Sequence, residues 1–134
     1  MDGIVIYKVD PDKSAITKHG FAESVPGGGP RHLKFSKDGK FIYLLNELSL
    51  SVTVFSWDAA SGTAKRLSTT PALSEEVKAA ETFNSAAEIV VHPSGDYVYS
   101  SNRGHDTVTV YQVDGGGAAR ASRPVLNQYA AETA

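Results

Sequence analysis

Two stretches of this chain match each other without a gap. Residues 31–58 align with residues 87–114 at a constant offset of 56. The identical pairs are Gly39 with Gly95, Tyr43 with Tyr99, Asn46 with Asn102, Val52, Thr53 and Val54 with Val108, Thr109 and Val110, and Asp58 with Asp114. A repeat of this length predicts a fold built from similar units, in which each unit covers part of the next.

A shorter third copy opens the chain, because residues 4–10 match residues 52–58 at an offset of 48. Apolar and polar residues alternate through 52–57 and 108–113, which indicates strands, and Asp38-Gly39 is a strong hairpin signal. Strands are expected near residues 3–10, 15–23, 31–36, 41–47, 51–58, 64–70, 87–92, 97–102 and 107–113. Four antiparallel strands per repeat predict an all-β fold of β-propeller blades, here a partial propeller.

The repeat also divides the chain into five parts. Good helix formers follow Ser74, which suits a helix N-cap, so a short helix is expected in an insertion between the two copies. The expected parts are the last two strands of one blade (1–26), a complete blade (27–72), a loop with a short helix (73–86), three strands of a second blade (87–114) and a divergent tail (115–134). The tail shows no strand alternation, except for a weak signal over 125–129.

Composition excludes several classes of function. The 134 residues carry a net charge of −2, which gives no reason to expect a nucleic acid or a membrane as partner. The chain has no cysteine, so disulfide and thiolate chemistry are excluded, and with no signal-peptide pattern a cytoplasmic location is expected. Gly27 to Pro30 lacks the lysine of a phosphate-binding loop, and no His, Asp and Glu set has zinc spacing.

Several recurring polar residues are best explained by structure. Asn46 and Asn102 follow equivalent strands, where a side-chain amide caps a turn. Asp10, Asp58 and Asp114 share a second such position and are expected to cap turns as well. His92 stands before Pro93 at the entry to a turn, and His19 is expected to be solvated on an outer strand.

Six other polar residues lie at the start of the first strand or after the second strand of the two copies. They are Arg31, His32, Glu47, Glu88, Arg103 and His105. His32 aligns with Glu88, and Glu47 aligns with Arg103, so equivalent positions carry different chemistry. A purely structural repeat would more often keep the same residue. From the residues alone, a functional and a structural role remain equally open for all six.

The motifs around these residues resemble a known family. The segment from Gly29 to Lys40 with Asn46-Glu47, and Ala87-Glu88-Ile89 with Ser101 to Asp106, are similar to motifs of the bacterial lactonase family of seven-bladed β-propellers. That family includes 6-phosphogluconolactonases and fungal carboxymuconate-lactonizing cyclases. The resemblance covers roughly residues 3–114 and implies hydrolysis of a sugar-acid lactone, a small-molecule substrate, with no cofactor and no metal.

The resemblance implies roles for the six residues. His32, Glu88 and His105 would be catalytic, and Arg31, Glu47 and Arg103 would bind the substrate. Lactone hydrolysis needs a polarised carbonyl and an activated water, and either His32 or Glu88 could be the general base. The chain holds about two and a half blades, so an incomplete and inactive site is also implied. The alternative is a non-enzymatic propeller segment that acts through self-association, as a dimer or, second, as a trimer.

Overall fold

The computed structural model describes residues 1–117, 119–121 and 125–126. Almost all of this is β-structure. The strands are β1 (Gly3–Asp10), β2 (Ala15–Glu23), β3 (Pro30–Phe35), β4 (Phe41–Asn46), β5 (Ser51–Asp58), β6 (Thr63–Pro71), β7 (Ser85–Val91), β8 (Tyr97–Arg103), β9 (Thr107–Val113), β10 (Ala119–Ala121) and β11 (Val125–Leu126). Within the described part of the chain, no helix has the length and apolar character needed to cross a bilayer.

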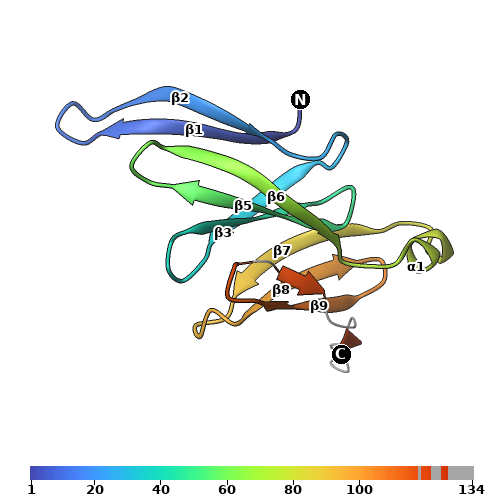
Figure 1. The fold of residues 1–134 in the computed structure, drawn as a ribbon. Coiled ribbons are helices and arrows are strands. Elements are labelled where there is room, and N and C mark those ends of the chain that lie inside the picture. The colour runs from blue at the N-terminus through green and yellow to red at the C-terminus, as the bar shows by residue number, and fades with distance from the viewer. Residues whose placement is uncertain (118, 122–124, 127–134) are drawn as a thin grey trace, which may run out of the picture.

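The strands form three stacked layers (Figure 1). The first layer is the β1–β2 hairpin, the second is the sheet β3-β4-β5-β6, and the third is the sheet β7-β8-β9-β10, in which β11 also pairs with β9. Every pairing is antiparallel, and each sheet follows chain order from one edge to the other. This is the meander of a propeller blade, which confirms the predicted fold class.

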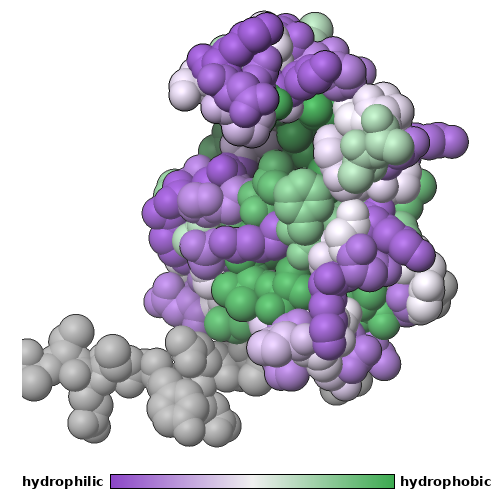
Figure 2. All heavy atoms as spheres, turned by 90° about the vertical axis from the view of Figure 1, so that its left-hand side faces the viewer, coloured by the Kyte–Doolittle hydropathy of each residue, from purple (hydrophilic) through white to green (hydrophobic). Residues whose placement is uncertain are grey.

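Strand β4 lies at the centre of the packing because its side chains alternate between two cores. Ile42 and Leu44 face the hairpin, where they join a cluster that includes Ile4 and Phe55. Tyr43 and Leu45 face the third layer and join a larger cluster. The period of two along a strand therefore lets one apolar strand bury both of its faces. Figure 2 views the three layers from the side of the turn between β1 and β2. On this side, apolar side chains gather below that polar turn.

The expected turns are present. Gly39 and Gly95 both have positive φ, 71° and 86°, at the equivalent hairpin turns of the second and third layers. The carboxylate of Asp58 accepts backbone N–H groups from Ala60 and Ser61, as a turn cap should. The caps at Asp10 and Asp114 are confirmed by equivalent bonds, and the ring of His92 bonds Ser94 within its own turn.

The insertion between the second and third layers contains helix α1 (Glu75–Ala80), as predicted. The hydroxyl of Ser74 accepts a hydrogen bond from the backbone N–H of Val77, which confirms the N-cap. Glu75 and Glu76 lie in the first turn of the helix, where negative charge is favoured. The helix therefore forms from local signals, and it buries no side chain fully.

The structure contains one strand, β10, that no clear signal in the sequence predicted. Strand β10 pairs with β9 along the outer edge of the third layer, and it gives that sheet a fourth strand like that of the second layer. Residues Ala119–Ala121 lack the β-branched and aromatic residues typical of strands, so neither propensity nor alternation indicated it. Most of the weak strand signal over 125–129 lies outside the described residues.

Candidate functional site

Glu47 and Arg103 hold equivalent positions of the repeat, each directly after a buried asparagine at the end of a strand. The side-chain amide of Asn46 donates to the hydroxyls of Ser51 and Thr53. Asn102 makes the same two bonds to Thr107 and Thr109. The structural interpretation of both asparagines is thus confirmed, and their role is to close the turns that present Glu47 and Arg103.

Glu47 joins two arginines that come from different layers. Its carboxylate accepts a hydrogen bond from Arg31 Nη1 of the second layer at 3.2 Å and another from Arg103 Nη2 of the third layer. The Nε of Arg31 also donates to the carbonyl of Ala87 in β7 at 2.9 Å. The Arg31 hydrogen bond is the main reason that the pKa of the Glu47 carboxyl lies below its ordinary value, and Arg103 adds to it. Glu47 is therefore a carboxylate that holds both guanidinium groups in place.

The backbone of Glu47 is held as firmly as its side chain. Its N–H donates to the carbonyl of Gly29 just before β3, and its carbonyl accepts the N–H of Ala86 in β7. The two bonds are 2.8 and 3.0 Å long. One residue after β4 thus links the strands β3 and β7, which carry Arg31 and Glu88. The cluster lies where the second and third layers meet.

Glu88 lies close to three basic side chains. The backbone N–H of Ile89 donates to its carboxylate, which is the largest cause of the lowered pKa of Glu88. The charges of His32, Lys34 and Arg31, on the neighbouring strand β3, lower this pKa further. His32 and Lys34 are two residues apart on one strand and therefore share a face.

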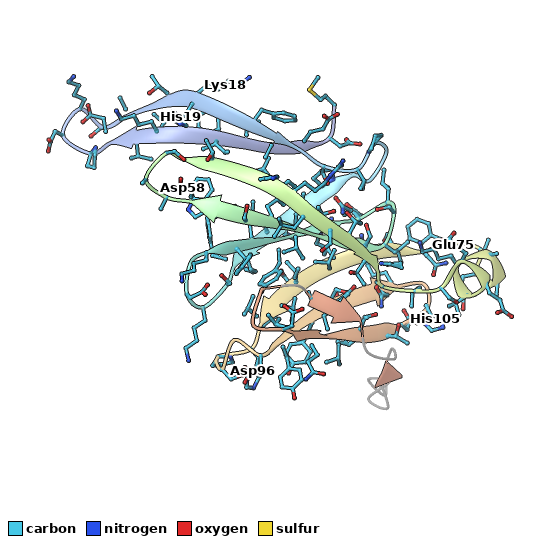
Figure 3. The ribbon with its side chains drawn as sticks, viewed as in Figure 1. Lys18, His19, Asp58, Glu75, Asp96 and His105 are labelled. Carbon is cyan, nitrogen blue, oxygen red and sulfur yellow. The ribbon has the colours of Figure 1, made fainter. Side chains whose placement is uncertain are left out.

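His105 lies at the same end of the sheets as α1, in the turn between β8 and β9 (Figure 3). Its Nδ1 shares a hydrogen bond of 2.9 Å with the hydroxyl of Thr107, which also accepts from Asn102. Among the described residues, no hydrogen bond joins His105 to the arginine cluster. His105 therefore supports its own turn, and its predicted catalytic role stays a prediction.

The structure brings five of the six predicted residues into one neighbourhood. Arg31, Glu47 and Arg103 are joined by hydrogen bonds, and Glu88 and His32 interact electrostatically beside them. Lys34 was not among the site residues predicted from the sequence. Its signal was the period of two along β3, which places it on the face of His32.

The cluster has the chemistry to bind an anion. Arg31, Arg103 and Lys34 supply three positive charges against the two carboxylates of Glu47 and Glu88. In the described part of the chain, neither Nη2 of Arg31 nor Nη1 of Arg103 makes a hydrogen bond, so both can donate to a phosphate or carboxylate. No group of three His, Asp or Glu side chains in that part is placed to hold a metal ion.

Stacked four-stranded antiparallel sheets with charged residues at the inner strands define a segment of a β-propeller with a polar site between neighbouring blades. The family model of the lactonases, described as "Lactonase, 7-bladed beta-propeller", matches residues 1–123. The chain belongs to this lactonase family of seven-bladed β-propellers.

Relatives and solved structures agree with this membership. The chain is 36% identical over 99 residues to a 6-phosphogluconolactonase of Pectobacterium carotovorum. This alignment covers 72% of this chain and 28% of the relative. It is 30% identical over 115 residues to the 6-phosphogluconolactonase of Bacillus subtilis, which covers 85% of this chain and 31% of the relative. The periplasmic gluconolactonase PpgL of Pseudomonas aeruginosa superposes with a TM-score of 0.80 and 27% identity, over 95% of this chain and 36% of that one. The chain thus spans about a third of the length of these proteins.

Proposed function

We propose that this chain carries part of a lactonase site that binds and hydrolyses a sugar-acid lactone of the 6-phosphogluconolactone type. The observation that supports this most strongly is the Glu47 carboxylate, which holds Arg31 and Arg103 side by side from two neighbouring sheets. Two guanidinium groups fixed in this way form a preorganised receptor for the phosphate or carboxylate of such a substrate.

The proposed reaction is the addition of water to the lactone carbonyl. A general base removes a proton from the water, and the water oxygen bonds to the carbonyl carbon. The ring C–O bond then breaks, and the ring oxygen takes up a proton to give the hydroxy acid. Guanidinium N–H groups near the carbonyl would stabilise the negative charge on its oxygen during this step.

We infer that His32 rather than Glu88 is this base. The pKa of Glu88 is lowered by the Ile89 N–H and by its basic neighbours, and a carboxylate with a lowered pKa is a weaker proton acceptor. A histidine imidazole, as a residue type, suits proton transfer near neutral pH. In this proposal Glu88 orients the basic side chains of β3, and Glu47 positions the arginines rather than touching the substrate.

The test is a lactonase assay on the purified chain with 6-phosphogluconolactone, corrected for spontaneous hydrolysis. We expect His32→Ala to lower kcat by roughly 100-fold, as loss of a general base does. His19→Ala is the matched control, because His19 lies exposed on the β1–β2 hairpin (Figure 3) and, among the described residues, bonds the Ser61 carbonyl in the turn after β5. Equal rates for the chain and for His32→Ala would remove the catalytic proposal.

Binding is measured separately with the product 6-phosphogluconate by calorimetry. We expect Arg31→Gln and Arg103→Gln to weaken it, because each removes one guanidinium group. Binding that neither substitution weakens would mean that the anion does not occupy this cluster.

A second candidate function is self-association of a propeller segment without enzymatic activity. One observation favours it: large apolar side chains on the outward face of the β1–β2 hairpin remain exposed. In a propeller, each sheet face is covered by a neighbouring blade. We propose that a second copy of this chain supplies the cover, with a dimer first and a trimer second.

A further inference from the structure

A cavity opens between the second and third layers, at the end of their strands opposite to the arginine cluster. It has a volume of about 450 Å³ and lies between the turn after β3 and the turn after β7. Figure 3 shows Asp96, in the second of these turns, at the far end of the third layer from His105. Every residue that lines the cavity belongs to these two layers or to the turn after β9, so both of its walls are present in the chain. A cavity of this size can hold a small organic molecule.

Two close contacts between the layers set the walls of this cavity. A Cβ placed on Gly95 would lie 3.2 Å from the Cβ of Lys37, so this lysine of the second layer packs over the turn of the third. Gly117 lies so close to the ring of Phe41 that a Cβ there would overlap it. The shape of the cavity is therefore fixed by packing between the two layers.

The lining of the cavity is acidic. Asp38, Asp96 and Asp114 contribute three carboxylates, and Lys37 contributes one ammonium group. Asp38 and Asp114 also cap their own turns, because each accepts a backbone N–H. Asp96 uses its backbone N–H within its turn, and its carboxylate makes no hydrogen bond among the described residues. The excess of negative charge disfavours an anion as ligand, and no three acidic or histidine side chains in the described part of the chain are placed to hold a metal ion.

Tyr43 supplies a buried polar group to the same cavity. It lines the cavity although the residue is 1% exposed, and its hydroxyl makes no hydrogen bond among the described residues. Burial raises the pKa of Tyr43 to about 12, and the charges of Asp38 and Asp114 add to the rise, so the hydroxyl lies within the field of both carboxylates. A buried hydroxyl without a partner costs stability, and an ammonium group of a ligand can donate to its oxygen.

We propose that this cavity binds a small organic cation, an amine with an apolar or aromatic body. The ammonium group donates to the Asp96 carboxylate and to the Tyr43 hydroxyl, which are the two polar groups without a partner. The body of the ligand lies over Phe41 and Val113, which are only partly buried by the core between the layers. The aromatic face of Phe41 also attracts a cation. This site is separate from the arginine cluster, and the proposal is independent of lactonase activity.

The first test is titration of the purified chain with phenethylammonium, followed by calorimetry and by NMR. We expect binding at millimolar concentration of this probe, with chemical-shift changes at the backbone amides of Ser36, Gly95 and Gly115, which line the cavity. Phenethyl alcohol has the same body without the charge, and it should bind roughly 10-fold more weakly because it lacks the charge-assisted hydrogen bonds. Equal binding of the two probes, or no binding of phenethylammonium at millimolar concentration, would overturn the proposal.

Two variants then test the residues that hold the ammonium group. Asp96→Asn and Tyr43→Phe should each weaken phenethylammonium binding by roughly 10-fold, because each removes one of its two hydrogen-bond partners. In the free protein neither group has a partner among the described residues, so the midpoint of urea unfolding should not fall in either variant. A lower midpoint together with weaker binding would assign the loss to the fold and overturn the direct contact.

Each variant has a matched control. Asp12→Asn removes the same charge from an exposed residue in the turn between β1 and β2. Tyr99→Phe removes a hydroxyl at the repeat equivalent of Tyr43, and Tyr99 does not line the cavity. Both controls should bind phenethylammonium as the unmodified chain does. A loss in Asp12→Asn as large as that in Asp96→Asn would show attraction by surface charge alone and would overturn the site.

Discussion

Asn102 holds the same place in the third layer that Asn46 holds in the second, yet only Asn46 has a hydrogen-bond partner for its side-chain oxygen. The hydroxyl of Ser24 donates to Asn46 Oδ1 at 3.1 Å. Asn102 Oδ1 is buried and has no partner among the described residues. The repeat explains the difference. The backbone N–H of Ser24 donates to Asp2, and that of Ala72 donates to Leu50, so position 72 is the equivalent of Ser24 and carries no hydroxyl.

We expect Ala72→Ser to stabilise the protein. The new hydroxyl would donate to Asn102 Oδ1 as Ser24 does to Asn46, and satisfying a buried acceptor contributes about 1 kcal/mol. Ser24→Ala is the matched change in the other layer, and it should destabilise by about 1–3 kcal/mol because it leaves Asn46 Oδ1 unpaired. Urea unfolding measures both effects. The midpoint urea concentration should rise for Ala72→Ser and fall for Ser24→Ala, while the m-value stays the same. A lower midpoint for Ala72→Ser would mean that the added oxygen does not reach Asn102.

Gly104 should tolerate no side chain. It lies between Arg103 and His105 with φ of 93°, and a Cβ there would run into the carbonyl of Phe83. We expect Gly104→Ala to destabilise by roughly 3 kcal/mol and to displace Arg103 from Glu47, because strain from positive φ adds to a backbone overlap. Gly39→Ala is the control: its φ is 71° but nothing lies within 4 Å of the added carbon, so about 1 kcal/mol is expected. Similar losses for the two variants in chemical denaturation would contradict this.

The sequence could predict the strands because the repeat and the alternation are both local signals. Strands β1, β2, β5 and β9 were placed with their observed or nearly observed bounds. Strand β10 could not be predicted, because Ala119–Ala121 form a strand only through pairing with the edge of β9. Pairing at an edge depends on the partner strand, and such short segments carry little propensity of their own.

The site was predictable only in part. Aligning Glu47 with Arg103 showed that equivalent positions differ in charge, but not that they form an ion pair across two layers. That contact depends on how the sheets stack, which the repeat does not specify. The predicted role of Glu47 in substrate binding stays a prediction; the structure adds that both of its carboxylate oxygens accept hydrogen bonds from arginines.

Glu47 should stay ionised to a lower pH than an ordinary glutamate. Its pKa is lowered mainly by the hydrogen bond from Arg31, so Arg31→Gln should raise the pKa toward the ordinary value of about 4.3, and by more than Arg103→Gln does. Because the folded-state pKa is lowered, the pairing stabilises the fold above about pH 4.3, and this contribution is lost as pH falls through the folded-state pKa. NMR titration of the Glu47 carboxyl carbon gives the pKa directly. A larger effect of Arg103→Gln would mean that Arg103, and not Arg31, lowers the Glu47 pKa the most.

Alkaline pH should unfold the protein through its buried tyrosines. Burial raises the pKa of Tyr111 to about 12, and a hydrogen bond with Ser100 only partly offsets this. Since the folded-state pKa is raised above the unfolded value of about 10, the contribution of the protonated phenol is present below about pH 10 and is lost as pH rises toward 12. Tyr111→Phe removes the ionisable group, so its stability should fall less between about pH 9 and about pH 11 than that of the unmodified chain. At neutral pH the same variant should lose about 1 kcal/mol with the Ser100 hydrogen bond. Urea unfolding at both alkaline pH values measures the difference, and equal losses in the two proteins would show that Tyr111 does not control the alkaline limit.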